Sequence, residues 1–173
     1  MPFDSTDEWK YPPDDFDYQL MLKGAIALFR KQAVLDEAIE WFQEHQFLVH
    51  IMDAAPWQND DDFHSAVAAT LKFPDYYGRN MNALNDCLSD LEVPANSGTV
   101  VVLLHYDVFA RTDFELAHLI LDIFASNIWD FLVDGRKLLL LVQSDDGFIQ
   151  LGPLGRREAY WNPREWYNKD RRD

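Results

Sequence analysis

Apolar and polar residues follow two different repeats along the chain, and segments with the two repeats alternate. Apolar side chains at helical spacing predict helices at 33–45, 61–73 and 112–132. Short segments rich in leucine and β-branched residues predict buried strands near 47–52, 99–105 and 137–143. Strands that are separated by helices pair in parallel through crossover connections. The pattern therefore predicts an α/β protein with a small parallel sheet flanked by helices.

The pattern is weaker at both ends of the chain. Residues 18–30 predict two short extended segments separated by Gly24, which would add strands at the edge of the sheet; one helix through Gly24 is the alternative. Residues 1–17 are polar, acidic and proline-bearing, and they predict a loosely held arm. From residue 145 onward we expect a turn, a short strand at 148–152 and a tail that docks on the domain's own surface.

Charge narrows the range of partners. The chain has 30 acidic and 15 basic residues, which gives a formal net charge of −15. Such a field repels nucleic acid and anionic membranes and accelerates the encounter with a basic protein. Solubility or adaptation to salt explains the same excess equally well. The charge therefore favours a basic protein partner without requiring one.

Cysteine content and the pattern of the N-terminal residues indicate a compartment. Cys87 is the single cysteine, so an internal disulfide framework is excluded and a reducing environment is expected. The first residues have no basic segment followed by an apolar one, as a signal peptide would. The longest apolar runs are far shorter than the roughly 20 residues that cross a bilayer. We expect a soluble, cytoplasmic protein.

Motifs of enzymes are missing from the sequence. The five histidines have no metal-ligand spacing, and there is no nucleophile elbow, Walker loop or dinucleotide fingerprint. The acidic runs 60–62 and 145–146 could supply paired carboxylates, but they are more typical of a helix start and a turn. We therefore expect no catalytic residue, no metal and no cofactor.

The segment 73–92, FPDYYGRNMNALNDCLSDLE, has an unusual set of polar residues. Asn80 is a good N-cap, which predicts a helix from Met81 to Leu91. Helical spacing separates an apolar side, with Met81, Leu84, Leu88 and Leu91, from a polar side, with Asn82, Asn85, Asp86 and Ser89. Two adjacent tyrosines precede this helix, and aromatic anchors beside a few polar groups suit protein recognition. The alternative is a solvated helix with Tyr76 and Tyr77 both in the core.

The motif FPDYYGRNMNALNDCL resembles the signature loop and second helix of the barstar family, intracellular inhibitors of the secreted ribonuclease barnase. The resemblance covers about residues 46–144 and implies a three-layer arrangement. It also implies a contact surface on the loop and the following helix: Tyr76, Gly78, Asn80 and Asp86, with Asp86 facing the phosphate site of the ribonuclease. Asn82 stands where the family has another acid and Asn85 where it has a tryptophan, which predicts a target other than barnase itself. Asp130 matches the family's glutamate near the end of the third helix.

The resemblance implies four parts of the chain and a function. The parts are an acidic arm (1–17), an N-terminal extension (18–45), a barstar-like domain (46–144) and a C-terminal tail (145–173). The expected function is non-enzymatic inhibition of a basic toxin, a secreted ribonuclease or a related one, by a protein that is monomeric when free. The alternative is an interaction or regulatory module that kept the fold without a toxin partner.

Overall fold

The computed structural model describes residues 15–172. Its longer helices are α1 (Phe16–Lys23), α2 (Gln32–Glu44), α3 (Asp60–Leu71), α4 (Met81–Ser89), α5 (Tyr106–Thr112) and α6 (Phe114–Val133). Its strands are β1 (Ile26–Phe29), β2 (Leu48–Asp53), β3 (Thr99–Leu104), β4 (Leu138–Gln143), β5 (Pro153–Leu154), β6 (Arg157–Glu158) and β7 (Tyr160–Trp161). Two short 3-10 helices, Pro163–Glu165 and Asn168–Arg171, follow.

Five strands form one parallel sheet in the order β2-β3-β4-β1-β7. In the middle of the sheet Val101 is paired with His50 on one side and with Leu140 on the other. The three predicted strands are therefore present and adjacent, within one residue of their expected bounds. The expectation of a small parallel sheet flanked by helices is confirmed.

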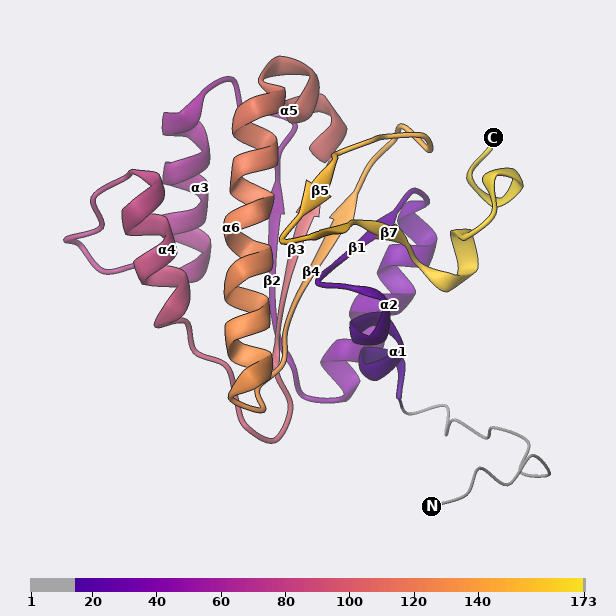
Figure 1. Cartoon of the computed structure of the whole chain (residues 1–173), viewed down its shortest axis with the longest axis horizontal. Helices are drawn as coiled ribbons and strands as arrows, with labels where there is room; N and C mark the ends of the chain where they lie inside the picture. Colours follow the sequence, from indigo (N-terminus) through magenta and orange to yellow (C-terminus); the bar gives the residue numbers. More distant parts are fainter. Residues whose placement is uncertain (1–14, 173) are drawn as a thin grey trace.

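Helices cover both faces of this sheet, so the molecule has three layers (Figure 1). Alternate side chains of β3 divide between two cores: Val101 and Leu103 pack with residues of α3 to α6, and Val100 and Val102 pack with residues of α1 and α2. All four valine and leucine side chains are fully buried. A strand buried on both faces needs the continuous apolar run that the sequence has there.

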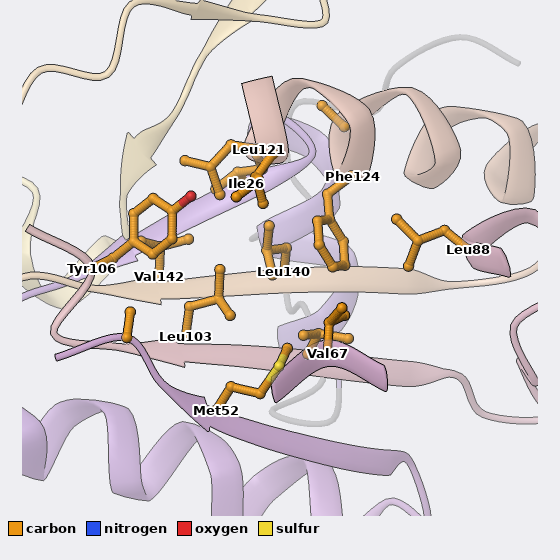
Figure 2. Close-up of a cluster of buried hydrophobic side chains, with 14 of the residues drawn as sticks. Ile26, Met52, Val67, Leu88, Leu103, Tyr106, Leu121, Phe124, Leu140 and Val142 are labelled. Carbon is orange, nitrogen blue, oxygen red and sulfur yellow. The ribbon is translucent and has the colours of Figure 1, made fainter. Parts of the chain in front are cut away.

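The larger core lies between the sheet and the α3–α6 layer. Figure 2 shows Leu121 and Phe124 of α6 pointing toward Leu140 of β4 and Leu103 of β3. By length and composition α6 could span a membrane. Eight of its 20 residues are instead buried within the protein, including both of these side chains. Its apolar character is explained by this packing.

The prediction for residues 18–30 is half wrong. The first segment is the helix α1 and not a strand, and the second is β1. A strand would have placed Tyr18, Leu20 and Leu22 on one face, but Leu20 is buried whereas Tyr18 and Leu22 are about half exposed. Tertiary packing decides this, because Leu20 enters the core on the α2 side of the sheet. The helix ends at Lys23, and Gly24 is its C-cap.

The position predicted for the added strand is also wrong. β1 is not at the edge of the sheet, because β7 of the tail pairs with its outer side through Ala27 and Tyr160. The predicted strand at 148–152 is absent; the tail instead forms the β5–β6 hairpin and β7. The tail docks on the domain, as expected. The acidic arm lies outside the described residues up to position 14, and the division of the chain into four parts stays a prediction.

Candidate functional site

The loop before α4 and the helix itself have the predicted amphipathic arrangement. Asn80 is the N-cap, and its side chain accepts a hydrogen bond from the backbone N–H of Ala83 at 2.9 Å. Leu84 and Leu88 are fully buried. The predicted polar side of the helix is exposed, with Asn82, Asn85, Asp86 and Ser89. The helix ends at Ser89, two residues before the predicted end.

The two adjacent tyrosines have opposite environments. Tyr76 is 84% exposed, whereas Tyr77 is buried. The alternative in which both rings enter the core is therefore wrong for Tyr76. The Tyr77 hydroxyl forms a short hydrogen bond with Nδ1 of His64 on α3, and Nε2 of His64 lies 3.0 Å from Oδ1 of Asp60. The loop is thus fixed to α3 through Tyr77 and leaves Tyr76 free to contact a partner.

Burial shifts the titration of both groups in this contact. It raises the pKa of Tyr77 to about 12, and it lowers the pKa of His64 below the ordinary value of 6.5. Both side chains are therefore neutral at neutral pH. When its proton is on Nε2, a neutral His64 can accept a hydrogen bond from the Tyr77 hydroxyl at Nδ1, so no buried charge is needed to position the loop.

Arg79 makes a second attachment of the loop. Its Nη2 donates to Oδ1 of Asp61 at 2.7 Å, to the Asp61 carbonyl at 3.0 Å and to Oγ of Ser65 at 2.9 Å. Arg79 also holds the left-handed conformation of the loop, with φ 53°. A Cβ at Gly78 would lie 3.2 Å from Nδ2 of Asn80, closer than an ordinary van der Waals contact, so a larger residue there would press on the capping side chain.

The surface formed by this loop and α4 is acidic. Segment 73–92 contains four acids, Asp75, Asp86, Asp90 and Glu92, and one base, Arg79, which is already paired with Asp61. Within residues 15–172 the Asp86 carboxylate has no hydrogen-bond or ion-pair partner. An exposed, unpaired carboxylate is available to a cation on a partner.

Asn85 is exposed but is not free. Its Oδ1 accepts a hydrogen bond of 2.9 Å from Nδ2 of Asn127, which is buried on α6. The same Nδ2 donates to the carbonyl of Ile123 at 3.0 Å. The amide pair joins α4 to α6, so Asn85 has a structural task in addition to any contact with a partner.

Asp130 lies at a distance from the loop. It is exposed on α6, one helical turn beyond Asn127, and it lines a groove of about 660 Å³ between α6 and the β5–β6 hairpin. In Figure 1, α6 separates α4 from β5. The structure therefore gathers Tyr76, Gly78, Asn80, Asn82, Asn85 and Asp86 on the loop and α4, and it places Asp130 on the neighbouring helix.

Three supporting residues were not recognised in the sequence: His64, Asp61 and Asn127. Two of them carried a signal, since His64 lies beside the buried Phe63 in an apolar helix and Asn127 is an uncharged amide inside the most apolar helix. Buried polar side chains nearly always have hydrogen-bond partners. Their partners, however, are 13 and 42 residues away in the sequence.

The acidic runs have the structural tasks that the sequence indicated. Residues 60–62 begin α3, where Oδ2 of Asp62 accepts from the Gln58 N–H and Oδ1 of Asn59 accepts from the Asp62 N–H. Asp146 accepts from the Phe148 N–H in a turn. Within residues 15–172 no three His, Cys, Asp or Glu side chains are placed to hold a metal ion.

Comparisons with known proteins identify the family of this chain. Residues 46–143, more than half of the 173 residues, match the family model described as "Barstar (barnase inhibitor)". A Bacillus subtilis (strain 168) protein described as "Putative ribonuclease inhibitor YrdF" is 46% identical over 39 residues, 22% of this chain and 43% of that protein. The match thus spans less than half of the relative's length. Among solved structures, the Walker-type ATPase PABY2304 of Pyrococcus abyssi is 12% identical, and the alignment covers 76% of this chain and 43% of the ATPase chain. The TM-score of 0.40 is too low to indicate a shared fold or function.

Proposed function

Because the chain belongs to the barstar family, whose members are inhibitors and not enzymes, we propose that it is a non-enzymatic inhibitor of a basic toxin. The proposed target is a secreted ribonuclease or a related toxin, bound by the Tyr76 loop and α4. The proposed place of action is the cytoplasm, where the inhibitor is a monomer until it meets the toxin. We propose that the inhibitor binds neither nucleic acid nor a membrane.

The unpaired Asp86 is the observation that carries this proposal. A ribonuclease has cations in its active site to bind substrate phosphates, and an exposed carboxylate on a rigid helix can take the place of a phosphate. Asp86 is held by a helix whose opposite side, Leu84 and Leu88, is fully buried. Such a preorganised carboxylate needs little reordering when it binds.

The tyrosine loop adds the apolar part of the contact. Tyr76 is the most exposed large ring on this surface, while Tyr77 and Arg79 hold the loop in place. A rigid aromatic anchor beside a charged group is typical of the residues that dominate binding energy. The groove beside Tyr76, about 350 Å³, has Cys87 and Asp90 in its wall and not Asp86, so the exposed Asp86 carboxylate lies outside this groove, on the face of α4 that is proposed to meet the partner.

A second candidate function is an interaction or regulatory module without a toxin partner. Asn85 favours it, because this position holds a side chain engaged with Asn127 and not a free aromatic anchor. Asn82 favours it too, because the family's second acid on this helix is absent. Binding to ribonucleases distinguishes the two candidates.

The first prediction tests the inhibitor proposal through Asp86→Ala. We expect binding to a target ribonuclease to weaken by about 2–5 kcal/mol, because the variant leaves cations of the partner buried without a counter-charge. Folding stability should change by no more than about 0.5 kcal/mol, as is usual for an exposed residue. The measurement is calorimetric titration of small secreted ribonucleases, barnase included and each made catalytically inactive, together with thermal melting.

Two control variants separate binding from folding. Glu40→Ala removes one exposed carboxylate from α2, on the opposite face of the sheet, and should leave affinity unchanged. Leu84→Ala opens a cavity at a fully buried position and should destabilise the fold by roughly 2–5 kcal/mol. A properly folded Asp86→Ala variant that binds the ribonuclease as tightly as the wild type would contradict the proposed surface. Absence of binding to every ribonuclease would favour the second candidate.

A further inference from the structure

The β5–β6 hairpin of the tail forms a basic wall beside α6. The hairpin presents Arg156 and Arg157, both exposed, and the facing side of the groove has Asp122, Trp129 and Asp130. Within residues 15–172 neither guanidinium has a hydrogen bond or an ion pair; Arg157 lies over the Trp129 ring, 5.8 Å from its centroid. The hairpin thus places two adjacent cations without a hydrogen bond or ion pair on a chain with a net charge of −15.

The hairpin is fixed before any partner arrives. The Gly155 N–H donates to Oδ1 of Asp122 at 2.7 Å, and Nε2 of His118 lies at hydrogen-bond distance, 2.8 Å, from the carbonyl of Pro153. Leu154 is buried in the larger core. A Cβ at Gly155 would lie 3.2 Å from the Ala125 Cβ, so the turn lies directly against α6. The arginines therefore project from a rigid support.

The backbone conformation at Arg156 indicates that the arginine side chain has a function of its own. Gly155 and Arg156 have φ 56° and 77°, the left-handed pair of a tight hairpin turn. Glycine or asparagine adopts this conformation at lower cost than arginine does. A long cation at such a position, without a hydrogen bond or ion pair in the described part of the chain, fits a role in binding.

The groove and the proposed inhibitory surface lie on either side of α6. The Asn85–Asn127 hydrogen bond joins α4 to α6, and the hairpin packs on the opposite side of α6 (Figure 1). The two sites are thus separated by one helix, which is about 10 Å wide. An interface of standard size covers about 800 Å² on each partner, which is enough for one partner to extend across α6 from α4 to the hairpin.

We propose that Arg156 and Arg157 bind an acidic region on the rim of the same toxin whose basic active site faces Asp86. This inference rests on the proposed function and adds a specificity contact of opposite charge to it. A carboxylate-bearing surface fits better than a nucleic acid, because Asp122 and Asp130 in the same groove repel a run of phosphates. A partner without acids on that rim is bound less well, so the hairpin selects among ribonucleases.

The test compares two charge reversals of equal size. The variant Arg156→Glu/Arg157→Glu changes the groove, and the control Lys169→Glu/Arg172→Glu makes the same change in net charge at exposed residues near the C-terminus, far from α4 and α6. Association and dissociation rates are measured against the catalytically inactive ribonuclease that binds the wild type, at low and at physiological salt. Both variants become more acidic, so net charge alone would accelerate association with a basic ribonuclease in both.

We expect the groove variant to associate at least about tenfold more slowly than the control, because rim charges act mainly on the association rate. Changing an exposed Asp or Glu at the rim of the ribonuclease to Lys should restore the rate. Arg156→Gly should bind more weakly while its melting temperature stays equal or rises, since glycine fits the turn better. A merely structural arginine would not separate binding from melting in this way.

Other outcomes overturn one proposal or both. If Asp86→Ala weakens binding and the groove variant equals its control, the hairpin contact is refuted and the inhibitor proposal stands. If the groove variant is impaired and Asp86→Ala is not, the ribonuclease docks elsewhere than proposed. Binding of a fluorescent single-stranded RNA by the wild type, lost in the groove variant, would replace the protein partner with RNA. Failure of every ribonuclease to bind refutes both.

Discussion

At the scale of single residues, Asn82 is where this chain departs from the family in charge. It is exposed on α4, the helix that also carries Asp86, and the resemblance of the motif implies an acid at this position. Asn85 is smaller than the tryptophan that the resemblance implies at its position, but its hydrogen bond with Asn127 explains why an amide is present there. No described contact explains the amide of Asn82. Its exposure makes a substitution there a clean test of how the family's contact surface is used.

The second prediction is that Asn82→Asp strengthens binding to barnase, if barnase is bound in the family's manner. A hydrogen bond to a charged group contributes about 1.5–3 kcal/mol, so the gain should be about tenfold or more. Gln43→Glu, which adds one negative charge at an exposed position on α2, is the matched control. Equal gains in the two variants would show that only long-range attraction has changed.

At the scale of elements, the loop before α4 is held by α3 through two unlike contacts. One is the buried, neutral pair of Tyr77 and His64; the other is the exposed ion pair of Arg79 and Asp61. An exposed ion pair contributes little to stability and is weakened by salt. The buried pair should therefore dominate the position of the loop, and it contains His64, whose pKa burial lowers below the ordinary value of 6.5.

The third prediction concerns pH. Burial lowers the pKa of His64 below 6.5 in the folded protein, so the unfolded chain takes up this proton first as the pH falls. The stability from His64 is therefore complete above about pH 6.5 and is lost below it, with a slope of at most about 1.4 kcal/mol per pH unit. Urea unfolding at pH 7, 6 and 5 should show this loss in the wild type and a shallower slope in His64→Gln. His105, whose pKa the hydrogen bond with Asp53 raises, acts in the opposite direction and is the same in both proteins. Identical slopes would contradict the prediction.

At the scale of the whole molecule, the two ends of the chain complete the sheet on the side away from the candidate site. The buried carboxylate of Glu165 accepts the backbone N–H groups of Arg30 and Lys31, both at 2.8 Å, and Nδ2 of Asn162 at 2.7 Å. Arg171 donates to three backbone carbonyls and lies 4.6 Å from the Trp161 ring centroid. The Glu165 contacts attach the tail to the segment that follows β1, and the Arg171 contacts hold the parts of the tail together.

The fourth prediction is that Glu165→Gln destabilises the fold without affecting binding. The amide of glutamine presents N–H groups toward backbone N–H donors, which leaves at least one buried donor unsatisfied at a cost of about 1–3 kcal/mol. Urea unfolding measures the loss, and Glu158→Gln, at an exposed position of β6, should stay within about 0.5 kcal/mol of the wild type. Affinity for the ribonuclease should not change, because Glu165 lies on the other side of the sheet from α4. A loss of affinity in the folded variant would instead link the tail to the binding surface.

Much of the fold follows from local patterns in the sequence. The central strands β2, β3 and β4 and the helices α2, α3, α4 and α6 were predicted because each has an apolar repeat of one clear period. The amphipathic division of α4 followed from the same repeat, including the buried Leu84 and the exposed Asp86. The long motif at 73–88 identified the family, which the match over residues 46–143 confirms.

Only the tertiary structure decided the remainder, because the deciding contacts join residues that are distant in the sequence. Whether residues 18–23 form a strand or a helix depends on which side chains meet α2, and β1 is internal because β7, more than 130 residues later, covers its edge. The Tyr77–His64 and Asn85–Asn127 bonds show the same dependence. The sequence by itself determined which residues prefer burial, exposure or a helix cap, since these preferences are local. It left open which buried polar groups pair and what lies beside the binding surface, since pairing requires the whole chain to be folded.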